Sequence, residues 1–218
     1  MPAPAAAPAR PEPAPRPDFS RLELVALEPV GADAAAAGAK APAPAAPVTG
    51  AVLVIAGVGG PDAVRKLVGA LPADFRRPLL VQLKLDGGRY DNLVKQLARV
   101  SALPVAIAVP GETLAAATVY VLPERVGLRT EAEGLAFFDG ADDPVAALPP
   151  AESAVIVLSG AEPSRVDAVL ALSSRGGHVA GQAMEGCYDA TAVKLLAAGG
   201  VDLGSPAQLA EQLVARWP

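Results

Sequence analysis

Short apolar runs alternate with amphipathic segments from Thr49 to the C-terminus, and this alternation constrains the fold more than any other feature. The first run, AVLVIA at 51–56, has no polar residue, which is typical of a strand buried on both faces of a parallel sheet. The next segment, 61–71, repeats its apolar residues at helical spacing. Further strands are predicted over residues 79–83, 104–109, 154–159 and 177–182. Further helices are predicted over residues 91–100, 163–173 and 191–198, and from 205 to the C-terminus. The pattern predicts an α/β fold for residues 49–218, doubly wound, with a mostly parallel sheet and helices on both faces.

Three short segments interrupt the alternation. They cover residues 119–122, 127–130 and 135–138, and turn residues separate them. Short strands between turns favour antiparallel pairing. We therefore predict an antiparallel ribbon inserted between two α/β halves.

Residues 1–48 differ from the rest, because eleven of the 23 prolines lie there, mixed with alanine. Proline fixes φ and cannot donate a hydrogen bond to a strand partner, so the sequence predicts a disordered arm or linker. One apolar island, residues 19–30, interrupts it and predicts an edge strand or a short docking motif. The alternative is a stretch of linker that binds nothing. The candidate docking residues are Phe19, Leu22, Leu24 and Leu27.

The composition excludes several classes of protein. A net charge of -5 argues against a nucleic-acid surface, which needs clustered Lys and Arg. One Cys and one His exclude a disulfide framework and the usual Cys/His zinc sites, so we expect no metal and no cofactor. No apolar run reaches the roughly 18 to 20 residues of a membrane helix, and the N-terminus has no secretory signal pattern. We expect a cytoplasmic monomer.

Ligands of such folds bind at the carboxyl ends of the strands, so the segments that follow the strands are the candidate sites. The glycine-rich turn AGVGGP at 56–61 is compatible with nucleotide binding at a helix N-terminus, although a tight strand-to-helix connection explains it as well. Lys84 and Asp86 follow the second strand, where Lys84 is either a catalytic amine or a solvated side chain. Ser159 and Ser164 could be nucleophiles only with a base in reach, and turn or capping roles are favoured.

The one histidine and the one cysteine are predicted to lie apart. A histidine base would have to be His178, which begins a predicted strand, while Cys187 follows that strand. Extended residues rise by about 3.3 Å each, so roughly 20 Å separates them. This favours Cys187 as a half-buried small hydrophobe rather than as a partner of the imidazole.

Five segments together resemble those of a known family. The family's GASTGG, QHMPPG, DGE…YIAP, LTGMGxDG and AQxExSC segments occur in the same order and at similar spacing. Their counterparts here are IAGVGGP at 55–61, QLKLDG at 82–87, PGET at 110–113 with VYVLP at 119–123, LSGAEPSR at 158–165 and GQAMEGC at 181–187. From residue 52 onward the chain resembles the catalytic domain of chemotaxis protein-glutamate methylesterases, the CheB family.

The resemblance implies an active site that this chain has lost. Members of the family hydrolyse glutamyl methyl esters of chemoreceptors with a serine nucleophile, a histidine base and an orienting aspartate. These three positions fall on Gly57, Leu83 and Ser164, so no catalytic residues are expected there. In a triad hydrolase, loss of the serine or the histidine alone lowers kcat by about 2 × 10⁶. The segment between Gly140 and Ala154 is also shorter than in the family, and the proline-rich arm stands where the receiver domain of typical members lies.

Three functional hypotheses follow. The first is a catalytically inactive methylesterase-like protein of chemotaxis or motility signalling, which binds a chemoreceptor, a coupling protein or the receptor methyltransferase. The second is an active protein-glutamate methylesterase, deamidase or other hydrolase with a site rebuilt around Lys84, Asp86 or Ser164. The third is a nucleotide-binding domain that uses the glycine-rich turn.

Overall fold

The computed structural model describes residues 47–84 and 89–218. The predicted arm, apart from Pro47 and Val48, lies outside the described residues, and so do its four candidate docking residues and Asp86. Val48 already pairs with the body of the protein, because its carbonyl accepts a hydrogen bond from the Leu135 amide at 3.0 Å.

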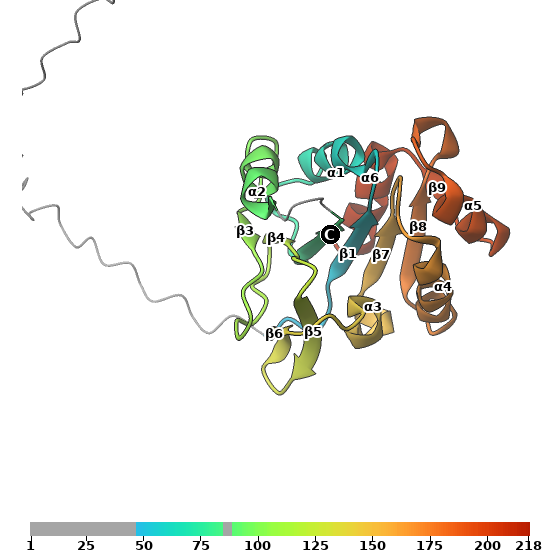
Figure 1. Ribbon diagram of the computed structural model, residues 1–218. Helices are drawn as coiled ribbons and strands as arrows, with labels where there is room; N and C mark the ends of the chain where they lie inside the picture. Colours follow the sequence, from blue (N-terminus) through green and yellow to red (C-terminus); the bar gives the residue numbers. More distant parts are fainter. Residues whose placement is uncertain (1–46, 85–88) are drawn as a thin grey trace, which may run out of the picture. The chain divides into compact units, whose positions relative to one another are not determined.

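A seven-stranded sheet forms the centre of the described residues, and every strand pair in it is parallel. The strand order is β3-β4-β2-β1-β7-β8-β9. The chain therefore builds one half of the sheet outward from β1 and then returns to build the other half from β7 (Figure 1). The strands are β1 (Val52–Ala56), β2 (Leu79–Leu83), β3 (Val105–Ile107), β4 (Val119–Val121), β7 (Ala154–Val157), β8 (His178–Gln182) and β9 (Leu203–Gly204). The predicted doubly wound, parallel arrangement is confirmed.

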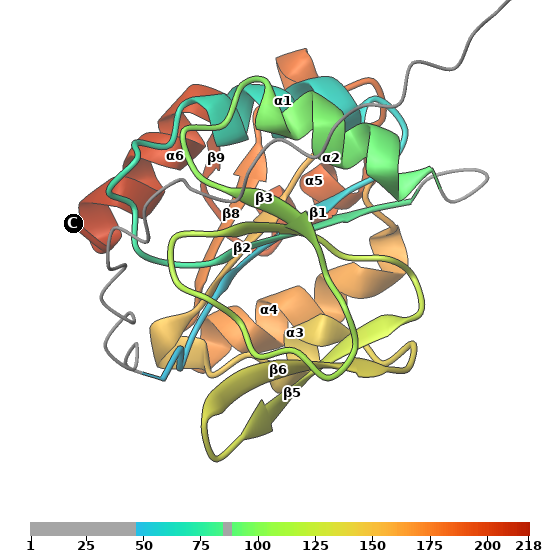
Figure 2. The same ribbon diagram turned by 90° about the vertical axis from the view of Figure 1, so that its left-hand side faces the viewer.

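Helices cover both faces of the sheet, as predicted. Helices α1, α2 and α6 share one apolar core with the sheet, and α3, α4 and α5 share the other. Figure 2 shows α1, α2 and α6 above the sheet and α3 and α4 below it. The helices are α1 (Gly60–Gly69), α2 (Tyr90–Ala98), α3 (Pro144–Ala147), α4 (Val166–Ser174), α5 (Thr191–Ala198) and α6 (Pro206–Arg216).

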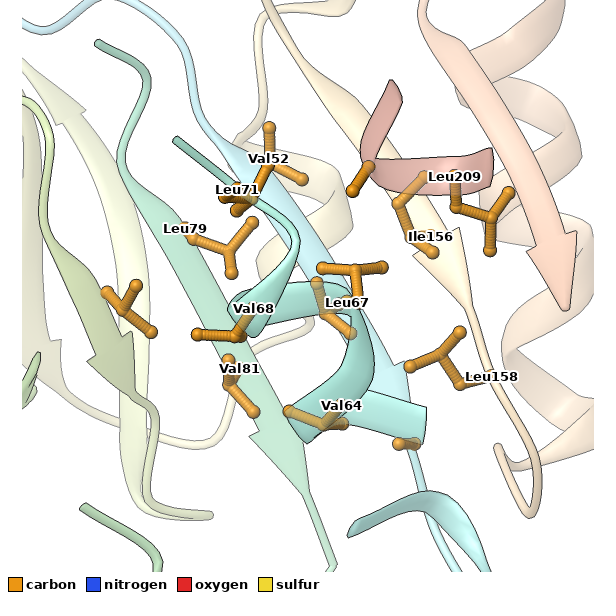
Figure 3. Packing of buried hydrophobic residues seen from close by; sticks show 14 of the residues in the cluster. Val52, Val64, Leu67, Val68, Leu71, Leu79, Val81, Ile156, Leu158 and Leu209 are labelled. Atoms are coloured by element: carbon orange, nitrogen blue, oxygen red, sulfur yellow. The ribbon is translucent and has the colours of Figure 1, made fainter. Parts of the chain in front are cut away.

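Helix α1 shows why the alternating pattern folds in this way. Its apolar residues recur at helical spacing, and the side chains of Val64, Leu67 and Val68 are fully buried. In Figure 3 they point onto the sheet, toward residues of β1, β2 and β7 such as Val81 and Ile156. Burying each such side chain contributes about 1.5–3 kcal/mol, so packing rather than capping fixes this helix. Its N-cap residue makes no side-chain hydrogen bond.

The predicted ribbon is present but smaller than expected. Strands β5 (Val126–Glu131) and β6 (Gly134–Asp139) form an antiparallel pair, which confirms two of the three predicted segments. The third prediction is wrong, because Val119–Val121 is β4 of the main sheet, where it pairs in parallel with β2 and β3. Pairing on both sides buries β4 completely, which a separate ribbon would not do.

Four short elements were not predicted, one of them the 3-10 turn η3 (Met184–Gly186) after β8. Helix α3 has four residues, and its N-cap is Asp143, whose carboxylate accepts a hydrogen bond from the Val145 amide at 2.9 Å. A 3-10 turn, η1 (Pro150–Glu152), follows it, and strand β9 adds two residues at the edge of the sheet beside β8. These elements are too short to show a period in the sequence.

Candidate functional site

The strand order reverses between β1 and β7, and a pocket of about 250 Å³ lies at the carboxyl ends of the central strands. A crevice at such a reversal is the usual ligand site of a doubly wound fold. The floor is apolar and the rim carries charged side chains. The pocket is lined by Ile55, Ala56, Gln82, Leu83, Lys84, Leu122, Glu124, Gly160, Glu162 and Arg165.

The three positions that the resemblance aligned with a catalytic triad all lie at this edge of the sheet. Gly57 directly follows β1, Leu83 ends β2, and Ser164 lies in the 3-10 turn η2 (Pro163–Arg165) after β7. Leu83 lines the pocket but is only 2% exposed, since it packs into the core shared with α1. The side chain of Ser164 is exposed. No two of these three residues form a hydrogen-bonded pair of a nucleophile and a base.

The backbone leaves no room for a side chain at Gly57. A Cβ atom there would lie 1.9 Å from the carbonyl oxygen of Gly160, closer than any nonbonded contact allows. The Gly57 amide also donates to the Ser159 carbonyl at 3.0 Å, which holds the two loops together. Gly160 has a φ of 73°, and a Cβ on it would lie 2.2 Å from the Val58 nitrogen. The two loops cross so closely that both position 57 and position 160 require glycine.

The glycine-rich turn uses its amides internally. Besides the Gly57 amide, the Gly60 amide donates to the Gly57 carbonyl at 2.9 Å. Gly59, the N-cap of α1, has a φ of 80°, a conformation that glycine adopts without strain. These two amides therefore serve the strand-to-helix connection, whereas a phosphate cradle needs its amides directed at the ligand.

Ser159 joins three loops through one hydroxyl group. The side chain is fully buried, and its Oγ donates to the Val58 carbonyl at 3.1 Å. The same oxygen accepts hydrogen bonds from the amides of Tyr188 and Asp189, at 3.0 and 3.1 Å. The Ser159 amide donates to the Gln182 side chain at 2.9 Å. Its role is thus structural, and broader than the turn or capping role predicted from the sequence.

Two ion pairs cross the rim of the pocket. Arg165 donates from Nη1 to Gln82 at 2.6 Å and from Nη2 to the carboxylate of Asp143 at 2.5 Å, and its side chain is 18% exposed. Lys84 Nζ lies 2.9 Å from Glu162, and this contact holds the pKa of the Glu162 carboxyl below its usual range. The Lys84 side chain is 65% exposed, so it is a solvated amine rather than the desolvated one that a rebuilt site would need.

The Arg165 contacts were missed by sequence reasoning. Gln82 precedes Arg165 by 83 residues and Asp143 precedes it by 22, so no local spacing reports them. Only a predicted topology that brings β2, α3 and η2 together could have suggested them.

His178 and Cys187 are separated as predicted. His178 begins β8 opposite the first residue of β7, at the amino edge of the sheet, while the pocket lies at the carboxyl edge. Burial and the nearby Arg216 lower the pKa of His178. Cys187 is partly buried against the core, and burial, with Asp189 and Glu185 next, raises the pKa of its thiol. The Cys187 thiol therefore stays protonated and uncharged at neutral pH, which agrees with the predicted role of a small hydrophobic side chain.

Residues 47–84 and 89–218 contain neither a candidate metal cluster nor a helix that could span a membrane. No group of three or more His, Cys, Asp or Glu side chains in that part of the chain could hold a metal ion. Within the same ranges, no helix has the length and apolar character needed to span a bilayer.

A parallel sheet with its pocket at the reversal, plus a small antiparallel ribbon, places the described residues among the doubly wound α/β domains. The crystal structure of the Thermotoga maritima CheB methylesterase catalytic domain matches with a TM-score of 0.67 and 21% identity, covering 77% of this chain and 99% of that domain. The chain belongs to the CheB methylesterase family, whose model matches residues 52–213.

Curated relatives are similar over part of the chain. A protein-glutamate methylesterase/protein-glutamine glutaminase 4 of Myxococcus xanthus is 38% identical over 87 residues, which are 40% of this chain and 25% of that protein. A protein-glutamate methylesterase/protein-glutamine glutaminase 2 of Caulobacter vibrioides is 32% identical over 130 residues, which are 60% of this chain and 32% of that protein. The similarity thus spans about a quarter to a third of the length of these relatives.

Proposed function

We propose that this chain is a catalytically inactive CheB-type protein of a chemotaxis or motility system, and that it acts by binding other proteins. The observation that carries the proposal is the contact at Gly57, where the Gly160 carbonyl occupies the space that a nucleophilic side chain would need. An ester hydrolase of this type needs a nucleophile with a base within hydrogen-bond reach.

The position of the base supports the same conclusion. Leu83 cannot accept a proton, and the one histidine of the chain lies at the opposite edge of the sheet from the pocket. A triad hydrolase without its nucleophile and base loses about 2 × 10⁶ in kcat. What remains is the family scaffold with a charged pocket rim, which is suited to contact with a partner.

The named activity of the relatives suggests the partners. Proteins that act on methylated or amidated glutamyl side chains of chemoreceptors meet the receptor, and we place this chain among the same proteins in the cytoplasm, as a monomer. Candidate partners are the chemoreceptor, the coupling protein and the receptor methyltransferase.

One assay tests the loss of activity. The protein is incubated with a methylated chemoreceptor cytoplasmic domain, and with its glutamine-bearing form, while methanol and ammonia release are measured. We expect neither product above the buffer blank, with the T. maritima catalytic domain as the positive control. Methanol or ammonia released in proportion to the protein concentration would contradict the proposal.

A hydrolase with a rebuilt site is the second candidate, because Lys84 and Glu162 both line the pocket. If the assay shows turnover, the variants Lys84→Met and Ser164→Ala decide whether it arises there. Loss of turnover in either variant, with unchanged thermal unfolding, would favour the rebuilt site. Turnover that both variants retain would exclude it.

A further inference from the structure

Tyr188 and Val58 are the most exposed large apolar side chains of the described residues, at 83% and 68%. They belong to two different loops at the carboxyl edge of the sheet, where Val58 directly follows Gly57 and Tyr188 lies against Gly59. Every other aromatic side chain in the described ranges is buried or half-buried. Isolated exposed apolar residues are ordinary, but a neighbouring pair that includes the one exposed aromatic requires an explanation.

The two side chains are held on a fixed backbone. The buried hydroxyl of Ser159 donates to the Val58 carbonyl and accepts from the Tyr188 amide. Tyr188 also lies over Gly59, since a Cβ atom at Gly59 would be 2.4 Å from the Cβ of Tyr188. A partner would therefore meet both side chains on loops whose backbone is already fixed, which reduces the entropy lost on binding.

The same surface carries acidic charge. Glu185 and Asp189 flank Tyr188 closely enough that both act on the thiol of Cys187 between them. Asp189 accepts hydrogen bonds from the amide and hydroxyl of Thr191, at 2.9 and 2.7 Å, and these lower its pKa and keep it ionised. Neither carboxylate forms an ion pair within 4.0 Å in the described part of the chain, although Lys194 on α5 is near enough to Asp189 to contribute to its lowered pKa. Exposed Met184, at 39%, adds to the apolar area.

We propose that Val58, Met184 and Tyr188, the Tyr188 surface, bind a protein partner that offers an apolar pocket bordered by Lys or Arg. Tyrosine is enriched among residues that dominate binding energy, and an exposed ring that projects from the loops fits a pocket rather than a flat face. Basic side chains at the border of that pocket complement Glu185 and Asp189. The inference rests on the proposed function, because it names the surface through which the binding takes place.

Purified probes test it. The chemoreceptor cytoplasmic domain, the coupling protein and the receptor methyltransferase are each titrated with the full chain, at low and high salt. For the probe that binds, we expect Tyr188→Ala to weaken binding at least about tenfold, as for a residue at the centre of an interface. We expect Glu185→Lys to weaken binding several-fold and to reduce its salt dependence. Matched controls are Val100→Ala, with an apolar residue 42% exposed on another surface, and Glu211→Lys on α6, and both should bind as the unmodified protein does.

The outcomes separate the two proposals. If a probe binds and Tyr188→Ala and Glu185→Lys bind equally well, the Tyr188 surface is excluded while the proposed function stands. If no probe binds, the proposed partners are wrong, and a photo-crosslinking amino acid at position 188 is compared in cells with one at position 100. A protein crosslinked only from 188, whose purified form loses affinity for Tyr188→Ala, supports the surface. Equal crosslinking from both positions overturns it.

Discussion

The contact between Gly57 and Gly160 determines which side chains the first turn accepts. Placing a serine at Gly57 is the direct test of whether this turn accepts a nucleophile. Here the backbone itself has closed the position, because a carbonyl oxygen lies 1.9 Å from where a Cβ would be. A substitution at this position must move one of two strand ends that are hydrogen-bonded to each other.

We therefore expect Gly57→Ser to destabilise the fold without creating an esterase. Forcing extra atoms into a packed site lowers the free energy of unfolding by about 1–3 kcal/mol, which urea denaturation would measure. Gly69→Ser is the matched control, because a Cβ there meets its neighbours at 3.4 Å or more. A stable Gly57→Ser variant that hydrolyses p-nitrophenyl acetate would show that the turn still accepts a nucleophile.

His178 predicts how stability depends on pH. Burial and Arg216 lower its pKa in the folded protein, so below the ordinary value of 6.5 the unfolded chain binds more protons than the folded one. The free energy of unfolding should therefore fall as the pH is lowered below about 6.5. The carboxyl groups whose pKa is lowered have ordinary pKa values of 3.8 or 4.5, so their contribution to stability changes only at lower pH.

The variant His178→Gln should flatten the stability profile between about pH 5 and 6.5, because it removes the one imidazole of the chain. Chemical denaturation at several pH values measures this. Arg216→Gln should reduce the slope without abolishing it, since burial is the larger cause. An unchanged slope in His178→Gln would mean that another group titrates in this range.

Among the secondary-structure elements, Arg165 links β2 to the start of α3. Its guanidinium bonds to Gln82 and to Asp143, the residue that caps α3, and both partners are themselves partly buried. Breaking a pair of this kind leaves the remaining carboxylate without its cation. A short helix with few core contacts depends strongly on such a link.

Arg165→Met should lower the free energy of unfolding by about 1.5–3 kcal/mol, the range for hydrogen bonds to charged groups. Arg129→Met is the control, because the Arg129–Glu131 pair is more exposed, at 56% and 38%. Pairs of that kind contribute about 0–1 kcal/mol. Thermal and urea unfolding compare the two variants, and equal effects would show that Arg165 is only a surface contact.

Sequence patterns predicted the longer secondary-structure elements better than the short ones. A run of six apolar residues identified β1, a segment with four apolar residues out of five identified β2, and helical spacing identified α1, because each signal is local. Strand β4 was assigned wrongly, since three residues show no clear period and its partners in β2 and β3 are distant in sequence. For the site, the series of motifs located Gly57, Leu83 and Ser164. The contacts at Gly160 and Arg165 depend on the folded backbone and could not be read from any motif.

For the whole molecule, the first described residues already contact the central domain. Val48 pairs with β6 through Gly134 and Leu135, and Gly50 lies against the backbone of Glu152.

Removal of residues 1–46 should change the melting temperature by less than about 2 °C, whereas removal of 1–49 should lower it by roughly 2–4 °C or more. A change of about 1 kcal/mol corresponds to that shift for a domain of this size. Differential scanning calorimetry of the two shortened chains tests this. A large loss on removal of 1–46 alone would show that the earlier segment contributes to the fold.

The buried hydroxyl of Ser159 limits which combinations of substitutions this edge of the sheet can accept during evolution. One oxygen atom joins the loops after β1 and β7 to the loop before α5. Residues that share a bond network are not energetically additive, so a substitution in one loop alters which substitutions the other two accept. We therefore expect substitutions in the glycine-rich turn, at Ser159 and in the Tyr188 surface to depend on one another. Chimeras in which only one of these three loops comes from a relative should be less stable than chimeras in which all three loops are exchanged together.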